Sequence, residues 1–137
     1  MISWNKGNSN FSTKRDDILI TINRYHPDIF AIHEANYSTK NDGQILGYNI
    51  EHNTLVSNYT ISRSLLIIKT GISYKSRYDL ENAYISSIWV QINISKKKSV
   101  FICSYYRQWS IPSILSVKNS NSVSNQVDRY RVLTIFS

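Results

Sequence analysis

The sequence contains little cysteine, no long apolar run and none of the common cofactor motifs. The single cysteine, Cys103, excludes an internal disulfide framework and a multi-cysteine metal site, and its apolar neighbours predict a buried, unreactive thiol. The apolar runs are too short to cross a membrane. The first residues lack the basic start and apolar stretch of a signal peptide, which favours an intracellular protein, the nucleus included. There is no phosphate-cradling glycine loop, and Tyr37 stands where an H-E-x-x-H zinc motif beginning at His33 requires histidine.

Acidic residues are also scarce. The chain has 16 Lys and Arg against 9 Asp and Glu, a formal net charge of +7. Such an excess favours a polyanionic partner, nucleic acid being the commonest, while solubility alone is the alternative explanation. Lys96, Lys97 and Lys98 form a triplet between two strand-like runs and predict the tip of a hairpin. A length of 137 residues with 42% hydrophobic content predicts one globular domain.

The beginning of the chain predicts a strand, a helix and a second strand. Residues 1–5 form the first strand, and Thr13 predicts the N-cap of an amphipathic helix over Lys14–Tyr25. The segment Pro27–Asn36 begins with a nearly continuous apolar run, which is typical of a strand buried on both faces. We expect Glu34 at its carboxyl end, where strands of layered α/β proteins present functional groups.

The remainder of the chain predicts mostly strands. We expect four of them, over residues 48–51, 63–69, 85–94 and 100–106, with loops over 37–47 and 108–124 and an irregular segment over 71–82. The last two strands flank the lysine triplet, and Ile88, Val90, Ile92 and Ile94 share one face at period two. Apolar residues near helical spacing predict a helix over 126–136.

Two pairs of polar residues follow predicted strands. If the strands ending at Asn5 and Glu34 are parallel neighbours, a carboxylate and an amide meet at one edge, a plausible site for a hard cation such as Mg²⁺. Tyr106 and Arg107 leave another strand with a hydroxyl donor and a planar cation, which suit phosphate. The alternative is ordinary strand-end chemistry: an exposed acid, a turn residue, edge aromatics and a solvated arginine.

Several of these segments together resemble one protein family. Ile2–Asn5 (ISWN), a helix, Pro27–Glu34 (PDIFAIHE) and the strand that ends in Tyr106-Arg107 occur in the order found in the endonuclease/exonuclease/phosphatase superfamily. The similarity is greatest to the apurinic-type endonuclease domain of non-LTR retrotransposons, in which a reverse transcriptase follows. The segment 126–130 is similar to the one that precedes the family's central catalytic motif.

The resemblance implies a fold, a reaction and a set of site residues. The fold is a four-layer α/β sandwich, and the reaction is Mg²⁺-dependent cleavage of DNA phosphodiester bonds. By resemblance Glu34 is the metal ligand, Asn5 orients metal or phosphate, Tyr106 is the active-site tyrosine and Arg107 contacts phosphate. His33 stands where the family often has glutamine.

The sequence departs from the family in one large respect. The central G-D-x-N motif and the terminal Asp-His pair do not occur before Ser137, so we expect residues 1–137 to be a partial domain, truncated after its first half and inactive alone. Half a sandwich leaves apolar strand faces uncovered, so we expect a poorly stable chain with Ile88, Val90 and Ile92 exposed.

Two other functions remain open at this point. One is a basic module that binds nucleic acid or a protein partner without catalysis. The other is a superfamily phosphoesterase that acts on phospholipid or inositol phosphates. The net charge and the Tyr106–Trp109 stretch favour nucleic acid over lipid.

Overall fold

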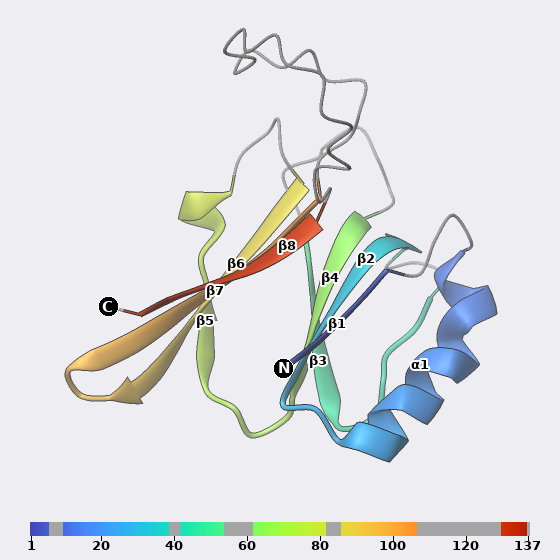
Figure 1. Ribbon diagram of the computed structural model, residues 1–137, viewed down its shortest axis with the longest axis horizontal. Coiled ribbons are helices and arrows are strands. Elements are labelled where there is room, and N and C mark those ends of the chain that lie inside the picture. Colours follow the sequence, from blue (N-terminus) through green and yellow to red (C-terminus); the bar gives the residue numbers. More distant parts are fainter. Residues whose placement is uncertain (6–9, 39–41, 54–61, 82–85, 107–129, 137) are drawn as a thin grey trace, which may run out of the picture.

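The computed structural model describes residues 1–5, 10–38, 42–53, 62–81, 86–106 and 130–136, which form two four-stranded sheets and one α-helix (Figure 1). Sheet one has the strand order β1-β2-β4-β3, and sheet two has the order β5-β6-β7-β8. The elements, in chain order, are β1 (Ile2–Asn5), α1 (Phe11–Tyr25), β2 (Ile29–Tyr37), β3 (Tyr48–His52), β4 (Ser62–Lys69), β5 (Tyr74–Ser76), the 3-10 helix η1 (Tyr78–Leu80), β6 (Ser86–Ser95), β7 (Lys98–Tyr106) and β8 (Tyr130–Phe136).

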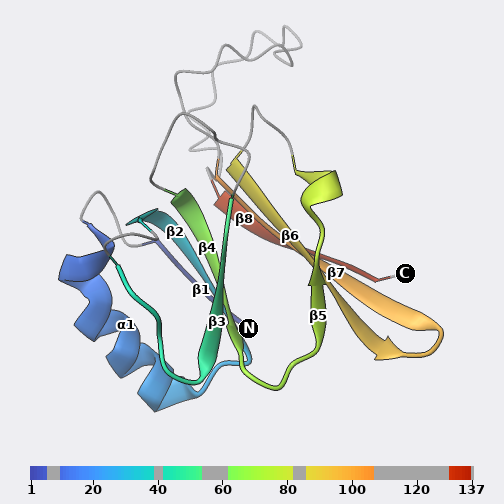
Figure 2. The same ribbon diagram turned by 180° about the vertical axis from the view of Figure 1, so that it is seen from behind.

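The described residues pack in three layers: helix, sheet and sheet. Figures 1 and 2 show α1 on the side of sheet one that faces away from sheet two. One apolar cluster joins α1 to sheet one and includes Ile18, Phe30 and Leu65. A second cluster fills the space between the sheets and includes Leu66 and Val90. The expected mixed α/β class is confirmed, and the layers seen among the described residues number three.

Strand β2 lies at the centre of this arrangement because it is apolar on both faces. Phe30 and Ile32 belong to the cluster on the α1 side, whereas Ile29 and Ala31 belong to the cluster between the sheets. β1 pairs with β2 in parallel, with Asn5 opposite His33. The predicted strand-helix-strand opening is therefore confirmed.

The helix begins three residues before the predicted start at Lys14. Phe11 is fully buried and its ring meets Tyr37 edge-on, with ring centroids 5.1 Å apart, so burial of Phe11 extends the helix by almost one turn. Asn10 takes the N-cap position, and the Thr13 hydroxyl donates to its carbonyl at 2.7 Å instead of capping. α1 ends as predicted, at left-handed His26. No helix among the described residues is long and apolar enough to cross a membrane.

Two predictions of secondary structure were wrong. Residues 130–136 belong to strand β8, which pairs with β7 from Tyr106 opposite Tyr130 to Val100 opposite Phe136, and not to a helix. The open edge of β7 offers a full row of hydrogen bonds, and the β-branched residues of this segment suit a pleated sheet. The segment 71–82, predicted irregular, contains β5 and η1. The predicted loop 108–124 lies outside the described residues.

The expected exposure of the β6 face was also wrong. Ile88 and Val90 are 1% and 0% exposed, because Ala31 and Leu66 of sheet one cover them. Ile92 is half-buried. The two sheets are thus each other's partners, and the apolar faces that we expected to be bare form the core between the sheets.

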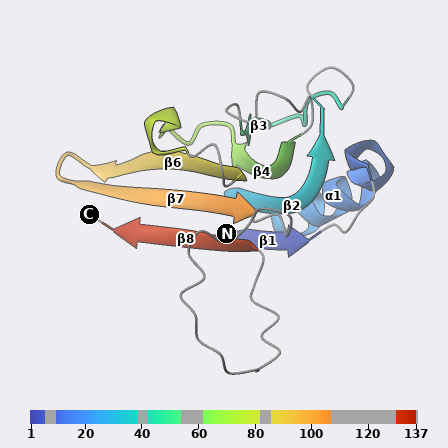
Figure 3. The ribbon, with the colours of Figure 1, turned by 90° about the horizontal axis from the view of Figure 1, so that it is seen from above.

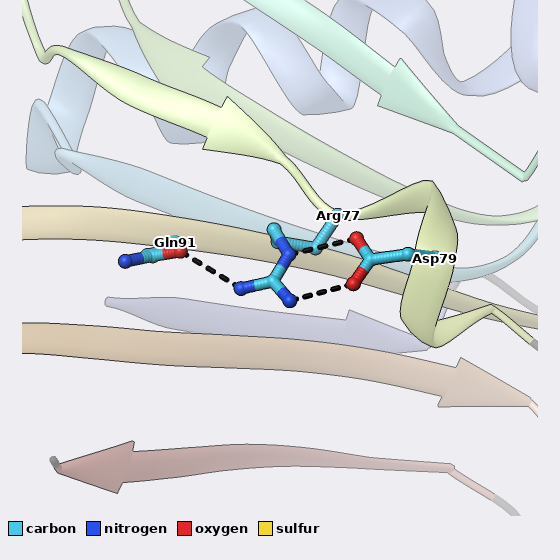
Figure 4. A network of polar contacts seen from close by, with 3 residues as sticks. All are labelled: Arg77, Asp79 and Gln91. Atoms are coloured by element: carbon cyan, nitrogen blue, oxygen red, sulfur yellow. Dashed lines mark hydrogen bonds and ion pairs between the residues drawn. The ribbon is translucent and has the colours of Figure 1, made fainter.

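Polar side chains tie the edges of the molecule together. Glu51 of β3 accepts hydrogen bonds from Tyr74 at 2.6 Å and from Ser76 at 2.9 Å, so the edge strands β3 and β5 join the two sheets on one side (Figure 2). On sheet two, Arg77 forms a two-pronged ion pair with Asp79 at 2.7 and 2.6 Å and donates to Gln91 at 2.9 Å (Figure 4). The second network fixes η1 against β6.

Candidate functional site

The strand ends that carry the predicted site residues lie at one end of the two-sheet sandwich, at the top of Figure 1. In sheet one, β1 ends at Asn5 beside His33 of the parallel strand β2. In sheet two, β7 ends at Tyr106 opposite Ser86, the first residue of β6. The Asn53 side chain, after β3, donates to the Ser87 carbonyl at 2.6 Å and so joins this end of one sheet to the same end of the other. We call this region the polar end.

The space between the sheets changes character toward the polar end. Alternation along each strand places a polar residue at the inner position that follows two apolar ones. The inner residues, in order toward the polar end, are Ile29, Ala31 and His33 on β2, Ile68, Leu66 and Ser64 on β4, and Val100, Ile102 and Ser104 on β7. The same three strands therefore build an apolar core and a polar end.

His33 is the largest polar group in this space. It is fully buried, and its Nε2 lies 3.2 Å from the hydroxyl oxygen of Ser3 on β1. Burial lowers the pKa of His33 to about 4, because a charged imidazole would lose its hydration here. His33 is therefore neutral at physiological pH and is suited to hold its neighbours in place.

Two buried hydroxyl groups accompany His33. Ser64 and Ser104 are both fully buried, and neither hydroxyl has a hydrogen-bond partner within the described part of the chain. Ser64 lies opposite His33 in the β2–β4 pairing. Buried polar groups of this kind cost stability, so the polar end is energetically different from the apolar core beside it.

Glu34 lies at a break in β2, not at its end. The pairing with β4 shifts between His33 and Tyr37, and Glu34 and Asn36 have left-handed backbone with φ of 54° and 47°. Figure 3 shows β2 bending in its final part. Arg63 of β4 donates to the Asn36 side chain at 2.8 Å across this bend. The expectation that Glu34 closes the strand was therefore wrong in its bounds, although regular pairing stops at the preceding residue.

Glu34 has the chemistry of a metal ligand, but few other metal-ligating side chains accompany it among the described residues. It is half-buried, and its carboxylate has no hydrogen bond or ion pair among the described residues. The described part of the chain contains no group of three His, Cys, Asp or Glu that could hold a metal. One carboxylate suits a Mg²⁺ ion that keeps most of its waters, and does not suit a fully caged ion.

The other predicted site residues are placed to different extents. Tyr106 is half-buried at the end of β7, and alternation from Ile102 and Ser104 puts it on the inner face. The structure describes the backbone of Asn5 but not its side chain. Arg107 lies outside the described residues. Cys103 is buried, as predicted, and burial raises the pKa of its thiol to about 12. That thiol is not a nucleophile.

Sequence reasoning missed several polar residues at this end: Ser3, Asn53, Ser64, Ser104 and Arg63. A signal was present for two of them, because Ser64 continues the alternation of Leu66 and Ile68, and Ser104 continues that of Val100 and Ile102. The link from Asn53 to the other sheet has no such signal, because it depends on how the sheets pack.

Comparisons of this chain with protein-family models, with curated proteins and with solved structures found no match. An assignment of function must therefore begin from the residues at the polar end.

Proposed function

We propose that the polar end is part of the active site of a Mg²⁺-dependent endonuclease that acts on DNA, of the endonuclease/exonuclease/phosphatase type. One observation carries the proposal. Asn5, Glu34 and Tyr106, which lie far apart in the sequence, come from three strands of two sheets to the same end of the sandwich. Ligand sites in layered α/β proteins form where strand ends open toward solvent, and a carboxylate there with a hydroxyl donor is suited to a metal-bound phosphate.

On this proposal each residue has a distinct task. A bound Mg²⁺ would polarise the scissile phosphate and stabilise charge on the leaving oxygen, and Glu34 would hold the ion. The Tyr106 hydroxyl would donate to a phosphate oxygen, and Asn5 would orient metal or phosphate. Neutral His33, held beside Ser3, would fix the β1 and β2 ends next to each other. Arg63 at the bend is a cation close enough to Asn36 to steady this segment.

These residues are only part of what hydrolysis needs. Residues 1–137 contain no G-D-x-N motif and no Asp-His pair to activate water. We therefore propose a half-site, by which we mean part of an active site that binds metal and DNA but does not cleave DNA by itself. DNA is favoured over phospholipid or inositol phosphates by the net charge of +7.

The second candidate function is a non-catalytic nucleic-acid-binding module. It is favoured because the described residues contain no group of three His, Cys, Asp or Glu that could hold a metal with Glu34 among its ligands. The two candidates differ in one property: a half-site binds a divalent cation at Glu34, and a simple binding module does not.

The experiment is a metal titration with Mn²⁺, whose unpaired electrons broaden nearby NMR signals. We expect the amide signals of Asn5 and of residues 33–36 to broaden first, and Glu34→Gln to remove the effect. Glu81→Gln is the matched control, because it makes the same change near η1 and should leave the broadening intact. Broadening that is unaffected by Glu34→Gln would reject the metal site and favour the binding module.

A further inference from the structure

The hairpin of β6 and β7 extends beyond the body of the molecule. Val90 is fully buried between the sheets, Ile92 is half-buried, and Ile94 is 63% exposed. Residues 93–98 are all exposed. Figures 1 and 2 show this part of the hairpin projecting past sheet one, at the end of β7 opposite Tyr106.

The tip of the hairpin is strongly cationic. Lys96, Lys97 and Lys98 are exposed, and none of the three forms an ion pair within the described residues. Other surface lysines do find acids: Lys14 lies 3.3 Å from Asp17, and Lys69 lies 4.0 Å from Asp28. The sequence of the whole hairpin, residues 86–106, contains no Asp or Glu. Nothing in the hairpin offsets its positive charge.

Turn geometry allows lysine at this place but does not require it. Lys96 and Lys97 form the two-residue connection between Ser95 and Lys98, which are paired. Connections of this length favour Asn and Gly, whose left-handed backbone matches the twist of the strands. Neither lysine has a left-handed backbone here. Three adjacent exposed like charges raise the local positive potential, so a polyanion that neutralises them is attracted to this tip.

We propose that Lys96, Lys97 and Lys98 form a contact for the phosphate backbone of nucleic acid, separate from the polar end. The nine-residue strand β7 runs from Lys98 to Tyr106. At about 3.3 Å per residue it separates the two places by roughly 26 Å, the length of about eight base pairs. The proposal takes one premise from the proposed function, namely that the ligand is nucleic acid. It requires neither a bound metal nor cleavage.

The test measures how binding of a duplex of about 20 base pairs depends on salt, between about 50 and 200 mM, by fluorescence anisotropy. We expect the variant Lys96→Gln/Lys97→Gln/Lys98→Gln to reduce the slope of log affinity against log salt by about two to three, near one for each phosphate that is no longer neutralised. The control variant Lys14→Gln/Arg24→Gln/Lys69→Gln removes the same charge from another part of the surface and should change the slope by less than about one.

Other outcomes would overturn the proposal. Equal slopes for the hairpin variant and the unmodified chain, equal reductions of the slope in both triple variants, or no duplex binding by the unmodified chain would each do so. Loss of binding to phosphatidylserine vesicles with an unchanged duplex slope would mark the tip as a membrane-binding surface instead. Because the triplet is exposed, the variant should keep its thermal unfolding midpoint. The hairpin variant should keep the Mn²⁺ broadening of residues 33–36, so failure of the metal site and failure of the hairpin contact are distinguishable.

Discussion

Between the two sheets, the region around Leu66 and Val90 and the region around His33, Ser64 and Ser104 are built from neighbouring positions of the same strands. The first contains only apolar side chains, all buried against one another. The second is as deeply buried, yet it contains an imidazole and two hydroxyl groups. Burial alone would select apolar residues at both places, because each buried apolar side chain contributes about 1.5 to 3 kcal/mol.

This difference suggests that the two regions have different roles. The apolar region accounts for the association of the sheets and hence for the fold. The buried hydroxyl groups of the polar end should lower stability, and this end lies where the strands of Asn5, Glu34 and Tyr106 come together. A cost in stability at one defined place is typical of functional sites, where the arrangement is kept for binding or catalysis. Four measurements test this comparison.

The largest effect is expected in the apolar region. Leu66 is fully buried between the sheets, so Leu66→Ala should lower the free energy of unfolding by about 2 to 5 kcal/mol, because it removes apolar packing and leaves a cavity. Leu46→Ala is the matched control, because Leu46 is 99% exposed and its truncation should have almost no effect. Urea denaturation measures both. A decrease below about 1 kcal/mol at Leu66 would show that the sheets do not depend on this core.

The polar end should make stability depend on pH. The pKa of His33 is lowered to about 4 in the folded protein, below the ordinary value of 6.5, so the unfolded chain takes up the proton first. Stability should therefore fall as pH falls from about 6.5 toward 4, by up to about 3 kcal/mol, and level off below. Thermal unfolding against pH in metal-free buffer measures this. His33→Gln should flatten this part of the profile, whereas exposed His26→Gln should not.

A smaller effect of opposite sign is expected at the buried hydroxyl groups. Ser64→Ala and Ser104→Ala each remove a buried hydroxyl that has no partner among the described residues, so each should leave stability unchanged or raise it by up to about 1 kcal/mol. Chemical denaturation of the two variants gives the answer. A decrease of more than about 1 kcal/mol would show that the hydroxyl groups are satisfied and that the polar end has no energetic cost.

The smallest expected effect is on cleavage itself. Glu34 is the one carboxylate among the predicted site residues, and residues 1–137 contain neither the G-D-x-N motif nor the Asp-His pair, so the purified chain should not nick supercoiled plasmid above background, with or without Mg²⁺. Glu34→Ala, assayed beside it, should give the same result, and the DNA binding of the unmodified chain should fall steeply as salt rises. Mg²⁺-dependent nicking that disappears in Glu34→Ala would prove the half-site to be a working enzyme.

The sequence predicted the features that depend on neighbouring residues and missed those that depend on residues far apart in the chain. The β1–β2 opening, the lysine turn and the strands around Leu66 and Ile102 follow from local apolar patterns, and the structure confirms them. The helix predicted over 126–136 failed because a spacing of three also occurs by chance in a strand. Its pairing with β7 joins segments that are far apart in the sequence, so no local pattern predicts it.

The candidate site was predictable to a similar degree. That the strands of Asn5 and Glu34 are neighbours was predicted from the polar residues that follow both strands, and it is confirmed. The bend at Glu34 was not predicted, since its backbone angles depend on how β2 fits against β4. The burial of His33 likewise depends on packing between the sheets, which no local pattern encodes.

The bend in β2 has a consequence for changes in chain length. Between His33 and Tyr37 the strand advances four residues while its partner advances two, from Ser64 to Ser62, so β2 holds two residues in excess. A regular strand would place Tyr37 on the face of His33, between the sheets, yet Tyr37 packs against Phe11 on the α1 side, so the extra residues turn the end of β2 over. Deletion of two residues here would restore regular pairing and turn the Tyr37 ring away from its helix. The length of this bend is therefore part of the fold, and a variant shortened by two residues should lose both the ring contact and stability.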